Sequence, residues 1–445
     1  MKPTKFIAGL AAFTFTASAY ADVQVDVTGA TAFRAASLLA IKAKYVASGA
    51  AFKFAHDQAT AGGTIYSGAT RAIFIGTFPG VTGTTTIRCC FTGSVEGIRA
   101  LVPVSDPLPP TYYQPSLLTS TTAVVGGAEL ANQGTTGALT DPSEIAFSDV
   151  AKASTPYSAF SLQPASPAAG VVVFTMLANE GSQVTNVTAQ GFRALMGGYQ
   201  PLSLFTGNEN DNPNDPAGDG SNATAGFVFG TGRNDGSGTR GVYLAETGFG
   251  VSKAVKQFVT TVSTSTALST IQLVPVNGGS TPANASTVWG ISLDGNGGYN
   301  SGSTLRTDMG KTGASVTVLE ANGTNTFGTG VTVRADLVTW LSLNDAITAR
   351  TNGALFCSYN GVKLNDIAAS GTTMSAADKA KVTEGVYTAW SFENMYRRND
   401  LTDASDSGKV YAGIKSSIQT NLGAAGIPIA DMHVGRPSDG GTVAP

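Results

Sequence analysis

Charged residues, histidines and cysteines are scarce in this sequence. Asp, Glu, Lys and Arg make up only 13% of the 445 residues, and the formal net charge at pH 7 is −3. No segment is strongly basic, so the chain lacks the electrostatic footprint with which proteins bind nucleic-acid phosphates. Beyond the first 21 residues, no apolar run reaches the roughly 18 to 20 residues that a membrane-spanning helix needs. The sequence therefore predicts a protein that neither binds nucleic acid nor spans a membrane.

The few cysteines and histidines argue against a metal site and against hydrolysis. Cys89, Cys90 and Cys357 lack zinc spacing. Adjacent cysteines bond each other only in strained geometry, so a disulfide, if present, would join Cys89 or Cys90 to Cys357. His56 and His433 lie in polar, loop-like sequence, and neither is close to a serine turn. We predict that the protein is not an enzyme and holds no metal or cofactor, with an exported hydrolase as a weak alternative.

The first 21 residues have the features of an export signal. Lys2 and Lys5 form a basic start, residues 6–16 are apolar, and residues 19–21 (AYA) form a small-x-small cleavage site. We expect cleavage after Ala21 and a periplasmic or extracellular location. The remaining length suits two lobes, each able to bury a core of its own.

Three segments share one pattern, in which a short apolar strand runs into a turn and then into a helix. They lie at residues 23–46, 87–101 and 226–248. A helix N-terminus aims backbone N–H groups at one point and adds roughly half a positive charge, which suits a small anion. A fourth apolar strand, within residues 144–150, ends in Asp149. Because ligands of open α/β sheets bind where strand ends meet, we predict an α/β fold with such a crevice.

The third turn, RNDGSGT at residues 233–239, is the most informative stretch. Its two glycines permit close backbone approach, its hydroxyls can donate, and Arg233 offers a planar fork for an oxyanion. The chain contains 54 glycines, so this run alone is equally typical of a surface turn. The order of the other motifs decides in favour of a binding site.

That order resembles the phosphate-binding proteins of ABC transporters, in the type 2 periplasmic binding protein superfamily. Residues 233–239 are similar to the family's R-x-D-G-S-G-T signature, and residues 28–33 (TGATAF) to its T-G-A-G-x-T-F run, shortened by one. Gly93 and Ser94 resemble its second serine turn, and residues 147–149 its S-D. The resemblance implies a two-lobed α/β fold with a ligand cleft between the lobes.

The resemblance also implies where the lobes divide. Lobe 1 would comprise residues 22–178 and 383–445, and lobe 2 residues 179–382. Residues 171–177, the most hydrophobic strand after the export signal, lie near the first crossing between the lobes.

Carried over position by position, the resemblance implies a set of anion ligands. Ser94 would donate from a helix start, and Asp149 would accept the proton of a protonated phosphate. Asp235 would orient Arg233. The complete set is Thr31, Phe33, Ser94, Asp149, Arg233, Asp235, Ser237, Gly238 and Thr239.

Three positions depart from the family's pattern and bear on the ligand's identity. Ala32 replaces a threonine, Arg34 replaces a proline, and Glu96 stands where small residues are favoured. The sequence thus predicts an exported solute-binding protein that clamps an oxyanion, inorganic phosphate first, for uptake through an ABC permease. The alternative is an extracellular structural or adhesive surface protein on the same fold, which the low charge and abundant Gly and Thr also suit.

Several local elements are predicted as well. Residues 251–272 are expected to form a helix, residues 340–362 a turn-linked β pair, and residues 386–390 a strand followed by a helix as far as residue 398. The Asn- and Asp-rich stretch at residues 206–224 has no glutamate at the twelfth position counted from Asp211, so a solvated loop is favoured over a calcium site.

Overall fold

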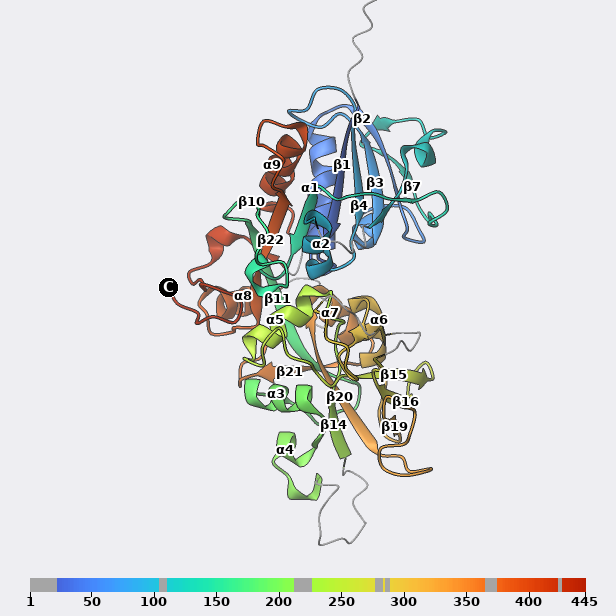
Figure 1. Ribbon diagram of the computed structural model, residues 1–445, viewed down its shortest axis with the longest axis vertical. Helices are drawn as coiled ribbons and strands as arrows, with labels where there is room; N and C mark the ends of the chain where they lie inside the picture. The colour runs from blue at the N-terminus through green and yellow to red at the C-terminus, as the bar shows by residue number, and fades with distance from the viewer. Residues whose placement is uncertain are drawn as a thin grey trace, which may run out of the picture.

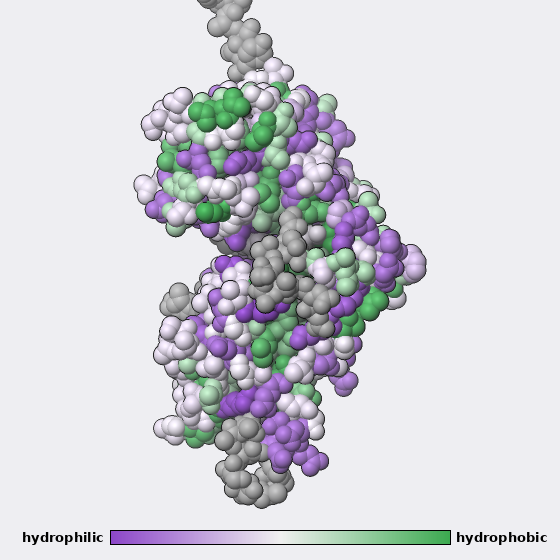
Figure 2. All heavy atoms as spheres, turned by 180° about the vertical axis from the view of Figure 1, so that it is seen from behind, coloured by the Kyte–Doolittle hydropathy of each residue, from purple (hydrophilic) through white to green (hydrophobic). Residues whose placement is uncertain are grey.

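The computed structural model has an upper and a lower half that meet at a narrower middle (Figures 1 and 2). It describes residues 22–103, 110–211, 226–276, 283–284, 289–364, 374–422 and 426–445, with only the backbone at 283–284. The predicted export signal lies outside the described residues. So does most of the Asn- and Asp-rich stretch, including Asp215 and Asp219.

The upper half is built on a mixed sheet with the strand order β2-β3-β4-β1-β9-β22 (Figure 1). Its strands are β1 (Val23–Gly29), β2 (Ala51–His56), β3 (Arg71–Gly76), β4 (Thr85–Cys90), β9 (Ile145–Ser148) and β22 (Trp390–Arg398). Its helices are α1 (Arg34–Ala47), α2 (Ser94–Leu101) and α9 (Asp406–Ile418). Because β1 is parallel to both β4 and β9, the carboxyl ends of these three strands meet at one edge. This edge faces the lower half, where Arg233 contacts Thr31.

The lower half contains the strands that extend from β11, in the order β13-β14-β20-β11. Its main elements are β14 (Gly226–Gly230), β20 (Arg334–Ser342), β21 (Leu355–Tyr359), α3 (Ala189–Gly197), α5 (Gly238–Glu246), α6 (Gly302–Met309) and α7 (Leu343–Thr351). A separate sheet consists of β15 (Phe258–Ser263), β16 (Leu268–Leu273) and β19 (Thr317–Leu319). In Figure 1 this small sheet lies beside β20.

The other elements are short. The strands are β5 (Thr111–Tyr112), β6 (Val124–Val125), β7 (Ala128–Leu130), β8 (Leu139–Thr140), β10 (Leu162–Gln163), β12 (Asn186–Val187), β13 (Gln200–Pro201), β17 (Ala283–Asn284), β18 (Gly298–Tyr299) and β23 (Gly426–Ile427). The helices and helical turns are α4 (Ser203–Thr206), α8 (Ala376–Thr383), η1 (Ile65–Gly68), η2 (Pro115–Leu118), η3 (Lys152–Ser154), η4 (Glu209–Asp211) and η5 (Ile429–Asp431). Among the helices of the described part of the chain, none has the length and apolar character to cross a membrane.

One strand, β11 (Ala168–Ala178), belongs to both halves. Its first part pairs with β22 as far as Val173, and its last part, from Phe174 onward, pairs with β20 and β21. All its residues after Ala168 are buried, which explains the uninterrupted hydrophobic run. The mixed sheets and flanking helices confirm the predicted α/β class. The predicted lobe boundaries at residues 178 and 383 stay predictions.

Three local predictions are wrong. The helix predicted at 251–272 is the antiparallel hairpin of β15 and β16, because its runs of Thr, Val and Ile favour strands. The helix predicted at 391–398 is part of β22, which is inserted between β9 and β11. The segment 340–362 is no hairpin, since α7 separates β20 from β21 and both strands pair with β11. In the latter two cases, pairing with distant strands decides the structure.

The cysteines form no disulfide. Cys89 and Cys90 lie in β4 of the upper half, and Cys357 lies in β21 of the lower half. All three are buried free thiols. The Sγ of Cys357 donates to the Val184 carbonyl at 3.1 Å.

The C-terminal tail is a further connection between the halves, in addition to β11 and to the return of the chain from β21 to β22. Arg436 Nη1 donates to Glu246 Oε2 of α5 at 2.8 Å, and its guanidinium lies 4.1 Å from the ring centroid of Trp390 in β22. Three residues later, an Asp439 carboxylate oxygen accepts from the Ala151 N–H at 2.8 Å, just beyond β9. The tail therefore ties α5 to the upper sheet on the side where the C-terminus lies in Figure 1.

A buried ion pair joins the two central strands of the upper sheet. Arg88 of β4 donates from Nε and Nη2 to the two carboxylate oxygens of Asp26 in β1, at 2.6 and 2.5 Å. Nη2 also lies 2.7 Å from Asp141 Oδ2. Burial raises the pKa of Asp26, and the Arg88 guanidinium opposes that rise. The carboxylate therefore depends on Arg88 to remain charged inside the sheet.

We expect Arg88→Ala to destabilise the protein strongly, because it leaves Asp26 buried without its cation. Breaking a buried pair in this way costs about 3–5 kcal/mol, to be measured by urea unfolding at neutral pH. The matched control is Lys409→Ala, which removes an exposed partner of Asp406 and should change stability by less than about 0.5 kcal/mol. Equal effects of the two substitutions would show that the Arg88 pair is not a major contributor.

Candidate functional site

The predicted site residues come together where the two halves meet. Thr31 follows β1, Ser94 opens α2 after β4, and Asp149 follows β9, all at the same edge of the upper sheet. From the lower half, Arg233 contacts Thr31, and Gly238 at the start of α5 lies against Ser94 and Asp149. The parallel strands explain this convergence, since their carboxyl ends share one edge.

Arg233 is buried, and each of its donor nitrogens is engaged. Nε donates to the Tyr299 carbonyl at 3.0 Å and Nη2 to the Asn300 carbonyl at 2.9 Å, both in the lower half. Nη1 donates across the boundary to Thr31 Oγ1 at 3.1 Å. Burial lowers the pKa of Arg233 to about 10, and the charge of Asp345 opposes this shift. The guanidinium is therefore a cation at neutral pH that links the two halves.

The N-terminus of α2 receives a carbonyl group from the opposite half. The N–H groups of Val95 and Glu96 lie 3.1 and 3.4 Å from the Gly236 oxygen, which accepts from both. The residue before the helix, Gly93, has a φ of 145°, and a Cβ there would lie 2.6 Å from that same oxygen. A glycine is therefore required at position 93 for the two turns to approach.

The turn at the start of α5 packs directly onto Ser94 and Asp149. A side chain at Gly238 would overlap with the Ser94 hydroxyl and reach within 2.9 Å of the Asp149 carboxyl carbon. Ser237 caps α5 through its backbone, and Ser237 and Thr239 are each only 2% exposed. Position 238 thus tolerates only glycine while the halves are in contact.

A carboxyl pair lies beneath this contact. Asp149 Oδ1 accepts from Ser94 Oγ at 3.0 Å, and its own N–H donates to Ser94 Oγ at 3.2 Å. Asn394 pairs with Ser148 across β22 and β9, and this register places Glu393 opposite Asp149. Side chains opposite each other on neighbouring strands have Cβ atoms about 4.5–5.5 Å apart.

Burial is the main cause of the raised pKa of both carboxyls. The hydrogen bond from Ser94 opposes the rise at Asp149, whereas the charge of Asp149 raises the pKa of Glu393 further. Glu393 therefore keeps its proton to a higher pH than an exposed glutamate does, because burial and the charge of Asp149 both disfavour its ionised form. Sequence reasoning missed Glu393, because it placed this residue in a helix. No local signal shows that its side chain points inward.

Two predicted ligands lie slightly apart from these contacts. Asp235 is buried, and its negative charge stabilises the cation of Arg240. Because the donors of Arg233 reach other acceptors, the orientation of Arg233 by Asp235 stays a prediction. Phe33 packs its ring against Phe147, with 6.0 Å between the centroids, and its predicted role as an N–H donor also stays a prediction.

Sequence reasoning also missed the acceptors of Arg233 and a cavity beside it. The acceptors, Tyr299 and Asn300, use their carbonyl groups, which no sequence motif reveals. The cavity, of about 430 Å³, lies between α1 and η1 of the upper half and α6 and α7 of the lower half, and Thr31 is part of its lining.

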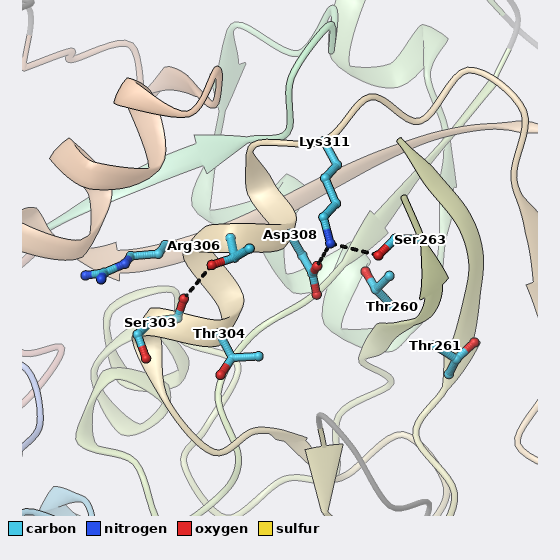
Figure 3. Close-up of a pocket in the computed structure, with 9 residues that line it drawn as sticks. Thr260, Thr261, Ser263, Ser303, Thr304, Arg306, Asp308 and Lys311 are labelled. Carbon is cyan, nitrogen blue, oxygen red and sulfur yellow. Dashed lines mark hydrogen bonds and ion pairs between the residues drawn. The ribbon is translucent and has the colours of Figure 1, made fainter. Parts of the chain in front are cut away.

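A second hollow, of about 570 Å³, lies in the lower half between β15 and α6 (Figure 3). Its central Lys311 Nζ lies 2.6 Å from Asp308 Oδ1 and 2.8 Å from Ser263 Oγ. The other oxygen of Asp308 accepts from the Tyr299 hydroxyl at 2.8 Å. Because these charges are already paired with one another, this hollow offers less to an anion than the meeting point of the halves.

The histidines are each bound by a glutamate. His56 Nε2 lies 2.8 Å from Glu129 Oε1 in the upper half, and His433 Nδ1 lies 2.5 Å from Glu384 Oε1 near the tail. Within the described residues, no group of three His, Cys, Asp or Glu side chains is arranged to hold a metal ion.

No family model matches the chain, and no curated protein matches it. Among solved structures it is similar to a protein from Clostridium perfringens described as a phosphate ABC transporter substrate-binding protein, with bound phosphate. The identity is 10% and the TM-score 0.37, over 91% of this chain and 99% of that one. For an ABC-type phosphate transport receptor from Vibrio cholerae, the identity is 12% and the TM-score 0.38, over 89% of this chain and 96% of that one. For PstS from Borrelia burgdorferi, the identity is 9% and the TM-score 0.33, over 90% of this chain and 96% of that one.

We expect Glu393→Gln to weaken the pH dependence of stability. Since the folded pKa of Glu393 lies well above 4.5, folding retains a proton that the unfolded chain releases. The free energy of unfolding then falls as pH rises from about 4.5 through the folded pKa. A glutamine at position 393 has no proton to lose, so the free energy of unfolding of Glu393→Gln should decline less steeply as pH rises.

The measurement is the melting temperature by calorimetry from pH 4.5 to about pH 8. Glu209→Gln, at an exposed glutamate, serves as the control and should follow the wild type. A Glu393→Gln curve parallel to that of the wild type would contradict a proton retained on Glu393 in the folded state.

Proposed function

We propose that the protein is an exported binding protein that takes up an oxyanion, first of all inorganic phosphate, between its two halves. The observation that carries this proposal is the convergence of helix starts with Arg233 and Asp149 at one buried point. Helix N-termini and a guanidinium favour a tetrahedral anion, and a fixed carboxylate accepts its remaining proton. We further propose a periplasmic location and delivery of the ligand to an ABC permease.

Binding would proceed by exchange of hydrogen bonds. In the closed contact, the N–H groups of Val95 and Glu96 donate to Gly236, and Arg233 donates to Thr31 and to two carbonyls. An anion would have to separate the halves and take over some of these donors. Its net affinity would then be the difference between two sets of hydrogen bonds, and therefore modest.

The same contacts favour a second candidate, an extracellular structural or adhesive protein. A carbonyl oxygen of Gly236 satisfies the start of α2 without any ligand, and Glu96 places a negative charge in the first turn of that helix. In a protein without a ligand, these contacts would simply lock the halves together. The two candidates differ in their response to phosphate.

We expect phosphate to raise the melting temperature of protein that has first been stripped of ligand. A ligand at about 100 times its dissociation constant stabilises the folded state by roughly 2.7 kcal/mol if the unfolded chain does not bind it. Arg233→Lys should abolish most of this gain, because an ammonium cannot reproduce the planar fork.

Arg350→Lys is the matched control, since Arg350 lies at the end of α7 with its guanidinium over the ring of Phe356. It should respond to phosphate as the wild type does. No stabilisation of the wild type at millimolar phosphate would favour the structural candidate.

We expect Asp149→Asn to narrow the preference for phosphate over sulfate. Near neutral pH phosphate carries at least one proton that the carboxylate can accept, whereas sulfate offers only lone pairs and like charge. An amide can donate to sulfate without repelling it. Competitive calorimetry with both anions should show the ratio of affinities falling by about tenfold or more, which is 1.4 kcal/mol or more.

The control for this comparison is Asp400→Asn, at an exposed carboxylate paired with Arg398. It should leave the ratio unchanged. An unchanged ratio in Asp149→Asn as well would reduce Asp149 to a structural role beneath Ser94.

A further inference from the structure

The cavity between the halves is too large for an inorganic ion alone. Its volume of about 430 Å³ falls within the roughly 300–1,000 Å³ that is usual for sites of small organic ligands. It lies directly beside the predicted anion site, because Thr31 both lines it and accepts from Arg233.

The upper wall of this cavity is positively charged. Arg34, the first residue of α1, is part of the lining, and its Nη1 makes only a long hydrogen bond of 3.4 Å to Thr70 Oγ1. The first turn of α1 contains no acidic residue, and its cap residue, Phe33, provides no side-chain acceptor for the N–H groups at the start of the helix. A long helix therefore presents its positive end and a weakly bonded guanidinium to the same space.

The lower wall adds a second guanidinium. Arg306 Nη1 of α6 donates to Asp345 Oδ1 of α7 at 2.7 Å, and both residues line the cavity. Arg306 also lines the other hollow, and Figure 3 shows its side chain extending from α6 away from Lys311 and Asp308.

The positive charge of Arg34 is close enough to those of Arg306 and Arg233 to be repelled by each of them. The carboxylates that act on Arg34 and Arg233 are Asp345, Asp57 and Asp149. Of these three, Asp345 lines the cavity. Asp57 accepts from the N–H groups of Thr70 and Arg71, and Asp149 accepts from Ser94. The cavity walls therefore carry two guanidinium groups against one carboxylate.

The cavity also has an apolar part. Leu39 of α1 and Ile347 of α7, both partly buried, line it from opposite halves. A ligand with carbon atoms would cover these side chains, which an inorganic anion leaves in contact with water.

We propose that this cavity binds a small phosphate monoester. Its phosphoryl group would lie at the start of α1 near Arg34 and Thr31, and its organic group would lie between Leu39 and Ile347. Arg306 would contribute its remaining donors from the lower wall. This inference rests on the proposed function in taking the head group to be an oxyanion, and it changes the ligand from an inorganic ion to an ester.

The test is calorimetric titration of the full chain with phenyl phosphate and with inorganic phosphate. Phenyl phosphate should bind about tenfold more tightly or better, because it buries a ring against apolar side chains. Arg34→Ala should weaken phenyl phosphate by about tenfold or more, as expected for a lost charge-assisted hydrogen bond. Lys409→Ala, which removes an exposed cation elsewhere, should leave both titrations unchanged.

Ala35→Phe provides a second variant that needs no charge removal. Ala35 lines the cavity, so a phenyl side chain there should fill it and abolish the preference for the ester while inorganic phosphate still binds. Inorganic phosphate binding as tightly as the ester in the wild type would overturn the inference and leave the proposed function standing. Binding of the ester without binding of inorganic phosphate would overturn the proposed function and leave the inference standing. Binding of neither ligand would overturn both the inference and the proposed function.

Discussion

The two halves are held together by the backbone hydrogen bonds of one shared strand. β11 completes the upper sheet through β22 and the lower sheet through β20 and β21. Neither half can pair its strands fully without it, so the register of β11 fixes where the edges of both sheets meet. The ends of β1, β4 and β9 and the start of α5 lie opposite one another as a consequence. All the contacts of the candidate site depend on that placement.

Between those edges, the protein buries charged side chains away from water, so its own polar groups must provide their hydrogen-bond partners. Arg233 donates to two carbonyls and a hydroxyl, and Asp149 accepts from the hydroxyl of Ser94. Unpaired polar groups in such a place would cost more than their hydrogen bonds gain, so the donors of Arg233 and the Asp149 oxygen that faces Ser94 each have a partner. A ligand that enters must replace these partners, and its size and protonation then matter more than its charge alone.

Local signals in the sequence were sufficient for the elements that carry the turns. The apolar periodicity of α1, the hydrophobic run of β11 and the glycines before α5 all act through neighbouring residues, and these elements were predicted. The hairpin of β15 and β16 was predicted as a helix although its Thr, Val and Ile favour strands, and most of β22 was predicted as a helix because its pairing depends on distant parts of the chain. Glu393 was missed for the same reason, since only the register with β9 turns it toward Asp149. The cavity is likewise formed by α1 and α7, whose juxtaposition no local pattern encodes.

The position of the C-terminal tail has a mechanical consequence. Through Glu246 and Ala151, the tail ties the halves together on the side where the C-terminus lies, whereas α6, which contributes Arg306 to the cavity, lies on the opposite side in Figure 1. These attachments all lie near β11 and define an axis, and a rotation about this axis moves the nearby atoms little and the distant atoms most. Opening would therefore be a hinge rotation whose axis lies near β11 and the tail. The two halves would separate first at Arg34 and Arg306, and the contact between Ser94 and Gly238 would break later.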